Sequence, residues 1–200
     1  HSIFHPQARQ DARKAFSLPQ EQKLILFTCQ KVTDKRKGMA YLLEALKYLN
    51  EPKPHLVVVG GNTEDLLNSN LGIDKGNLHF IPYVNGEREM ARLYSAVDCF
   101  VTPSLQDNLP NTIAEAMSCG TPCVGFNAGG IPEMIDHLHN GYIAEYKNVG
   151  DLANGIHWLL TEGEYDVLSR EAARKAANAY GENSVAMKYI SIYNRMTGKN

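Results

Sequence analysis

The sequence lacks several features that mark whole classes of protein. No apolar run approaches the roughly 20 residues that a membrane-spanning helix requires, and the opening residues HSIFHPQARQ lack the apolar core of a signal peptide. Lysine and arginine number 20 against 22 aspartates and glutamates, so the basic surplus typical of nucleic-acid binding is absent. The 4 cysteines include no CxxC pair, which argues against a zinc site or a disulfide framework. These absences predict a soluble, cytoplasmic protein that binds no nucleic acid.

Several catalytic and cofactor motifs are absent as well. Without GxxxxGK[ST] there is no P-loop for ATP, and without GxSxG nucleophilic hydrolysis is unsupported. No GxGxxG exists, so the pair Gly60-Gly61 indicates a tight turn rather than a site for NAD. Gly129-Gly130 either brings the backbone close to a ligand or makes a tight strand-to-helix connection. His137 and His139 have no clear third ligand, so we expect no metal there.

Short apolar runs define the expected fold. They are near-continuous rather than alternating, as strands covered by helices on both faces should be. The runs cover residues 24–28, 55–60, 78–81, 98–103 and 122–126. Helical spacing of apolar residues recurs between them, at residues 41–49, 87–96 and 112–117. The alternation predicts an α/β protein with a Rossmann-like, doubly wound parallel sheet of about six strands.

The two ends of the chain have a different character from its middle. Residues 6–16 predict a lead-in helix, and the final stretch predicts helices at 151–160, 165–180 and 184–196 with no strand between them. We therefore expect three parts. They are a linker and lead-in helix over residues 1–20, the α/β domain over 21–163, and a helical tail over 164–200.

The loop after the first strand is rich in cations. Lys31, Lys35, Arg36 and Lys37 follow the strand and precede a helix. Ligands of parallel sheets collect at the carboxyl ends of strands, and cations beside a helix start suit a phosphate. A solvated basic loop is the alternative, and the residues alone leave both interpretations open.

The loop after the fourth strand predicts an anion site. Asp107 or Asn108 can cap the following helix, and Pro110 suits its first turn. The free amides of residues 111–113 would then face outward at the positive end of the helix dipole. Glu115 lies about one turn further, on an otherwise apolar helix. Its carboxylate would accept hydrogen bonds there, either from sugar hydroxyls or from a structural partner.

A longer pattern joins these loops. Seven residues separate Asp107 from Glu115, and Ala-Met-Ser-Cys-Gly-Thr-Pro follows directly. The other matching pieces are Lys37-Gly38, Tyr94–Asp98, Gly129–Glu133 and Asn140–Ile143. In this order, from about residue 20 to residue 160, they resemble the retaining group 1 glycosyltransferases, family 4 of the GT-B fold.

The resemblance is to one half of such an enzyme. Transferases of this fold have two Rossmann-like domains, and these motifs belong to the C-terminal one, which binds the nucleotide-sugar donor. It implies that the chain binds a donor of the UDP or GDP type over residues 21–163 and is inactive alone. The acceptor, a sugar, glycan or lipid-linked molecule, would need an N-terminal domain, onto which the helix at 184–196 would cross. The full-length protein is expected to transfer a sugar with retention, to need no metal, to associate peripherally with the membrane and to serve bacterial polysaccharide synthesis.

The resemblance also implies roles for individual residues. Glu115 would hold the ribose hydroxyls, and Lys37 would neutralise the diphosphate as it leaves. Asp107, where many members have glutamate, and the backbone of residues 108–112 would face the donor sugar and the diphosphate. The implied catalytic residues are Asp107 and Lys37. The implied donor-binding residues are Lys31, Arg36, Lys37, Tyr83, Val84, Asn108, Leu109, Pro110, Asn111, Thr112 and Glu115, with Pro82 beside Tyr83 along the base.

Other functions fit the same architecture. One alternative is a GT-B-like enzyme of another kind, such as a sugar-nucleotide epimerase or a phosphorylase-like transferase. The other is a nucleotide-binding or interaction module without catalysis of its own. The acidic pair Asp107 and Glu115 favours descent from a working transferase.

Overall fold

The computed structural model describes residues 3–61, 74–81 and 83–197. Its centre is a 6-stranded sheet in the order β3-β2-β1-β4-β5-β6, in which every neighbouring pair is parallel. The strands are β1 (Leu24–Lys31), β2 (His55–Gly61), β3 (Leu78–Ile81), β4 (Cys99–Thr102), β5 (Cys123–Phe126) and β6 (Gly141–Ala144). The predicted doubly wound parallel sheet is confirmed.

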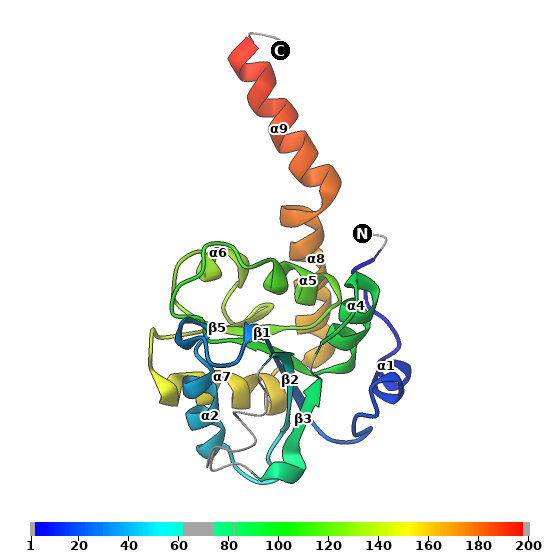
Figure 1. The fold of residues 1–200 in the computed structure, drawn as a ribbon. Helices are drawn as coiled ribbons and strands as arrows, with labels where there is room; N and C mark the ends of the chain where they lie inside the picture. Colours follow the sequence, from blue (N-terminus) through cyan, green and yellow to red (C-terminus); the bar gives the residue numbers. More distant parts are fainter. Residues whose placement is uncertain (1–2, 62–73, 82, 198–200) are drawn as a thin grey trace.

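Helices cover both faces of this sheet (Figure 1). The helices of the described residues are α1 (Arg9–Ala15), α2 (Met39–Lys47), α4 (Glu87–Ala96), α5 (Asn111–Ser118), α6 (Ile131–Met134), α7 (Val149–Thr161), α8 (Tyr165–Tyr180) and α9 (Glu182–Thr197), the last of which does not pack on the sheet. Within β1, Leu24 and Leu26 pack with the α1, α4 and α5 side, whereas Ile25 and Phe27 pack with α2 and α7. Because both faces are buried, the strand needs apolar residues at consecutive positions, which explains the continuous apolar run.

The predicted capping of α5 is wrong. Pro110 stands at the N-cap position, one residue before the helix, and among the described residues no side chain caps it. The carboxylate of Asp107 is instead paired with Lys37, and its backbone carbonyl accepts a hydrogen bond from the Gly130 amide. Contacts with two distant loops therefore replace the local cap.

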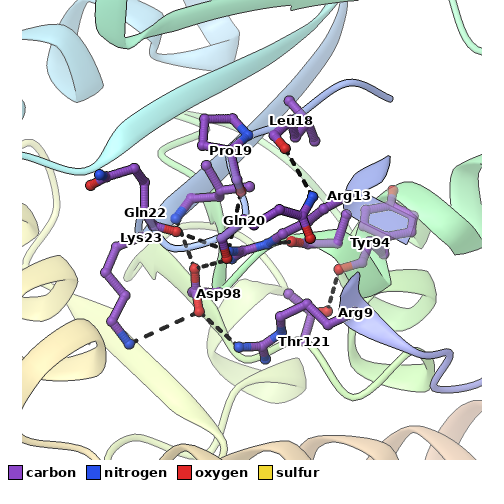
Figure 2. Close-up of polar contacts among 12 residues, drawn as sticks. Arg9, Arg13, Leu18, Pro19, Gln20, Gln22, Lys23, Tyr94, Asp98 and Thr121 are labelled. Atoms are coloured by element: carbon purple, nitrogen blue, oxygen red, sulfur yellow. Dashed lines mark hydrogen bonds and ion pairs between the residues drawn. The ribbon is translucent and has the colours of Figure 1, made fainter. Parts of the chain in front are cut away.

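A buried ion pair fastens α1 to the sheet (Figure 2). Arg13 Nη2 lies 2.8 Å from Asp98 Oδ2, and both side chains are almost fully buried. The same carboxylate oxygen accepts the Leu24 amide at 2.8 Å, and the other oxygen pairs with Arg9 at 2.9 Å. The remaining guanidinium N–H groups of Arg13 donate to backbone carbonyls, among them that of Ala96. The lead-in helix is thus an integral part of this domain.

The last helix, α9, extends away from the sheet (Figure 1). All of its residues are exposed or half-exposed, including several large apolar ones: Met187, Tyr189, Ile190, Ile192, Tyr193 and Met196. In the part of the chain that the structure describes, no helix is both long and apolar enough to cross a membrane. The crossing of this helix onto a second domain stays a prediction.

Candidate functional site

A cleft of about 1060 Å³ opens where β1, β2 and β4 end. We call it the strand-end cleft. Seven of the predicted donor-binding residues line it: Lys31, Arg36, Lys37, Tyr83, Val84, Thr112 and Glu115. Lys31, which the sequence predicted in the loop after the first strand, is instead the last residue of β1, and the others come from the loops after β1 and β3 and from the first turns of α5. Parallel strands bring their carboxyl ends together, so residues far apart in sequence meet at one edge of the sheet.

The other predicted residues lie around this cleft rather than on its lining. Leu109 and Asn111 line a second hollow of about 480 Å³, which also includes Glu115, Tyr180 and Glu182. Asn108 packs its backbone carbonyl against Gly130. Pro82 lies outside the described residues.

The free amides at the start of α5 are fewer than predicted. The Ile113 amide donates to the carbonyl of Pro110, the N-cap residue, at 3.0 Å. This bond joins residues three apart, as in the 3₁₀-type turns common at helix ends. At this end of the helix, the backbone amides of Asn111 and Thr112 donate to no backbone or side-chain acceptor among the described residues. The anion site predicted from three amides is therefore reduced to two.

The basic loop after β1 is partly neutralised by its own sequence. Asp34 accepts a hydrogen bond from the Arg36 amide at 3.0 Å and starts the short 3₁₀ helix η1 (Lys35–Lys37). The Arg36 guanidinium lies 2.8 Å from the same carboxylate and lowers the pKa of Asp34. Lys35 is exposed and is not among the residues that line the strand-end cleft. Lys31 and Lys37 are thus the better-placed cations for a phosphate.

Lys37 and Asp107, the two residues that the resemblance implies are catalytic, form an ion pair with each other. The Lys37 Nζ lies 2.8 Å from Asp107 Oδ2, with 37% of the Lys37 side chain and 18% of the Asp107 side chain exposed. The pair joins the loop after β1 to the loop after β4, which are neighbours because β1 and β4 are paired. Gly38, at φ +75°, permits this approach, since a Cβ there would stand 1.8 Å from the Pro103 carbonyl oxygen.

Glu115 has both a structural partner and access to the cleft. Its Oε2 accepts a hydrogen bond from the Tyr94 hydroxyl at 3.1 Å, and the residue lines the strand-end cleft. Burial raises the pKa of Glu115, while the bond from Tyr94 opposes that rise and the charge of Glu87 adds to it. The structural partner is thus Tyr94, and the contact of this carboxylate with sugar hydroxyls stays a prediction.

The glycine pair after β5 shapes the loop of Asp107 and Asn108. A Cβ on Gly129 would stand 1.8 Å from the Asp107 carbonyl oxygen, and one on Gly130 would stand 1.6 Å from that of Asn108. The Gly130 amide donates to the Asp107 carbonyl at 3.1 Å. The backbone of Gly129 and Gly130 thus lies close to the loop that contains Asp107 and Asn108, and it helps to hold that loop in place.

Sequence reasoning missed the polar floor of the strand-end cleft. Thr28, Cys29, Gln30 and Ser104 line it at the ends of β1 and β4. Buried Thr28 Oγ1 has no hydrogen-bond partner among the described residues. Burial raises the pKa of the Cys29 thiol to about 11, so the thiolate that a nucleophile needs is scarce at neutral pH. Position at a strand end was the only signal that could have identified them.

Metal ligands do not gather in the described part of the chain. Among residues 3–61, 74–81 and 83–197, no three His, Cys, Asp or Glu side chains are placed to hold a metal ion. His137 uses its Nδ1 on the Ile143 amide at 3.1 Å, and the His139 Nδ1 lies 2.9 Å from the His137 carbonyl. Both imidazoles thus serve the turn that leads into β6.

Comparison with known proteins identifies relatives along most of the chain. A glycosyltransferase of Methanocaldococcus jannaschii, described as uncharacterised, is 29% identical over 187 residues, which cover 90% of this chain and 47% of that protein. The chain thus spans about half the length of the relatives it matches.

Solved structures share the fold. The C-terminal domain of a glycosyl transferase group 1 family protein from Francisella tularensis has a TM-score of 0.74 at 23% identity, covering 90% of this chain and 97% of that one. An Anabaena protein, HepE, in complex with UDP-glucose has a TM-score of 0.80 at 20% identity, covering 96% of this chain and 54% of that one.

The family itself is shown by a match over most of the sequence. The family model described as "Glycosyl transferases group 1" covers residues 8–178, which include β1 to β6 and the strand-end cleft. The chain belongs to the group 1 glycosyltransferase family.

Proposed function

We propose that this chain is the donor-binding half of a longer glycosyltransferase and that the strand-end cleft holds a nucleoside diphosphate sugar. One observation carries the proposal: a single cleft is lined both by the cations Lys31 and Lys37 and by the carboxylate Glu115, which come from different elements of the fold. Cations suit a diphosphate and a carboxylate suits a pair of ribose hydroxyls. The cleft volume, about 1060 Å³, is ample for a ligand of this size.

Each end of the donor then has a partner. Glu115 accepts hydrogen bonds from the ribose hydroxyls, and Tyr83 and Val84, which also line the cleft, lie along the base. The diphosphate lies between Lys37 and the first amides of α5, where the helix dipole favours negative charge. The half-exposed side chain of Lys37 can turn from Asp107 to a phosphate oxygen without unfolding its loop.

Lys37 and Asp107 would each act as the diphosphate leaves the donor sugar. As the bond from the sugar to the diphosphate breaks, negative charge grows on the phosphate oxygen, and a lysine close to that oxygen stabilises it. Asp107, released from Lys37, is free to accept hydrogen bonds from the donor sugar. We propose that these groups serve in place of a metal ion and that the attacking hydroxyl arrives on the face from which the diphosphate leaves, with retention.

The donor is proposed to be of the UDP or GDP type. The Anabaena neighbour was crystallised with UDP-glucose, which favours a uridine donor as the first to test. The acceptor, a sugar, glycan or lipid-linked molecule, would be bound by the part of the longer protein that this chain does not include. A regulatory nucleotide-binding module is the second candidate, and it shares the binding step without the transfer.

The experiment is calorimetric titration of the chain with UDP, GDP and ADP, with and without magnesium. We expect one nucleotide to bind with little dependence on magnesium. Glu115→Ala should cost roughly 1–3 kcal/mol of binding free energy, since a charged acceptor is lost. The matched control is Glu21→Ala, which removes an exposed carboxylate just before β1.

A second pair of variants tests the diphosphate. Lys37→Ala should weaken binding of the diphosphate more than binding of the nucleoside, whereas Lys35→Ala, in the same loop but outside the cleft lining, should leave both unchanged. Equal effects of the two lysines would mean that the loop acts only through its net charge. Equal affinities of wild type and Glu115→Ala would refute the placement of the ribose.

A further inference from the structure

The hydroxyl of a buried tyrosine stands behind Glu115. Tyr94, on α4, is fully buried. Its ring packs edge-on against Phe100 on β4, with ring centroids 5.6 Å apart, and is tilted against Phe4 at 6.4 Å. Its backbone carbonyl accepts a hydrogen bond from Thr121 Oγ1 at 2.7 Å (Figure 2). A ring held by the core and by its own backbone has little freedom to turn, so its hydroxyl is a fixed point.

That fixed point holds one oxygen of Glu115. The Tyr94 hydroxyl donates to Oε2 at 3.1 Å, and this is the one hydrogen bond of the Glu115 side chain among the described residues. Glu115 is only partly buried and lines both the strand-end cleft and the second hollow. Without the tyrosine, the carboxylate could rotate freely between these two spaces.

We infer that Tyr94 is a positioning residue for Glu115: its buried hydroxyl anchors Oε2, so that Oε1 and the remaining lone pairs face the ribose of the nucleotide. The inference rests on the proposed function, because it needs a nucleotide in the strand-end cleft. It adds a residue that touches no substrate itself and acts through the carboxylate. The hydrogen bond that the buried Tyr94 hydroxyl donates also favours the ionised form of Glu115. An ionised carboxylate accepts two further hydrogen bonds from ribose hydroxyls better than a neutral carboxyl does.

The surroundings of Glu115 otherwise oppose its ionisation. Burial and the charge of Glu87, on α4, both raise its pKa, and the Tyr94 bond lowers it. Directly after α5, Cys119 is a buried thiol whose pKa is raised to about 12, so it stays neutral. From the α8–α9 side, Tyr180 and Glu182 line the second hollow with Glu115. Removal of the Tyr94 hydroxyl therefore leaves influences that push Glu115 toward its neutral form.

The test is Tyr94→Phe, which keeps the ring packing and deletes only the hydroxyl. We expect it to weaken UDP binding roughly tenfold and to move the acid limb of the affinity-against-pH profile to higher pH. The matched control is Tyr142→Phe, which removes a tyrosine hydroxyl that donates to another carboxylate, Asp151 Oδ1 at 2.8 Å, outside the cleft lining, and should leave that profile in place. In a Glu115→Gln background, which has no ionisable group at that position, Tyr94→Phe should no longer shift the profile.

The outcomes separate this inference from the proposed function. Loss of UDP binding in Glu115→Ala together with a wild-type profile in Tyr94→Phe would overturn the role of Tyr94 and leave the nucleotide site standing. Equal UDP binding by wild type and Glu115→Ala would refute the placement of the ribose at Glu115 and with it the role of Tyr94, whereas a wild-type chain that binds none of UDP, GDP and ADP would overturn the nucleotide site. Carbon-13 titration of the Glu115 carboxyl needs no nucleotide: an upward shift of its pKa in Tyr94→Phe supports the inference, and an unchanged pKa overturns it.

Discussion

Asp98→Asn should be among the most damaging conservative substitutions in this protein. The carboxylate sits at the start of β4 and neutralises Arg13 at 2.8 Å, while it also accepts the amide that begins β1. Its side chain is 3% exposed and that of Arg13 is 4% exposed. The side-chain amide of an asparagine at this position has no charge. Its N–H₂ group is a hydrogen-bond donor, and it would face the donors that the Asp98 carboxylate now accepts from.

The size of the stability loss depends on the cations that lose their partner when Asp98 is replaced. Arg9 and Lys23 approach the same carboxylate from partly exposed positions and can turn to water. Arg13 cannot, because its guanidinium is enclosed by the Ala96 carbonyl and the loop before β1. Breaking a buried pair by removing one partner costs about 3–5 kcal/mol. For a chain of 200 residues that corresponds to a fall in Tm of about 6–20 °C.

Urea unfolding of wild type, Asp98→Asn, Arg13→Met and the double variant measures this directly. We expect the double variant to be less destabilised than the sum of the single ones, because the second change removes a charge that the first left unpaired. Asp11→Asn, on the same helix but exposed and 3.8 Å from Lys14, is the control and should cost at most about 0.5 kcal/mol. A loss below about 1 kcal/mol for Asp98→Asn, or additive effects, would refute the view that this pair fastens α1 to the sheet.

Three further predictions concern the strand-end cleft. Gly130→Ala places a methyl group 1.6 Å from the Asn108 carbonyl oxygen, so we expect a loss of about 1–3 kcal/mol in unfolding free energy and weaker UDP binding by calorimetry. Gly76→Ala, which has no contact below 3.4 Å, is its control. Asp107→Asn frees Lys37 from its partner and should strengthen UDP binding by up to about fivefold, since half-exposed pairs are worth about 1 kcal/mol or less; weaker binding would show that Asp107 itself holds the nucleotide. Burial raises the pKa of Glu115 above its unfolded value, so the folded protein binds that proton more tightly and gains stability as pH falls through the raised pKa. Glu115→Gln should abolish this gain and raise Tm at neutral pH while it weakens UDP binding, and a Tm at or below that of wild type would contradict the expectation.

The parts of the fold that depend on local pattern could be predicted from the sequence. The continuous apolar runs required strands buried on both faces, and the spacing at residues 87–96 predicted α4 with its observed limits. Glu115 was predicted because a carboxylate on an apolar helix needs a partner, and the structure gives it Tyr94 on one side and the cleft on the other. These inferences use neighbours within one or two turns of the chain.

The parts that depend on long-range contact could not be predicted. Lys37 and Asp107 are 70 residues apart in sequence and meet only because β1 and β4 are adjacent in the sheet. Local rules assigned the cap of α5 to Asp107 or Asn108, but the helix begins at Asn111 with Pro110 at the N-cap position. Arg13 and Asp98, 85 residues apart, look like ordinary surface charges in the sequence, and only burial makes them a structural pair.

The central claim, that the strand-end cleft is a nucleotide site, is tested most directly by a crystal structure of the chain with UDP. The account predicts ribose hydroxyls within hydrogen-bond distance of the Glu115 carboxylate, a diphosphate oxygen close to Lys37 Nζ, and Tyr94 still bonded to Oε2. UDP in the second hollow beside Leu109, or in the cleft with its ribose turned away from Glu115, would contradict it.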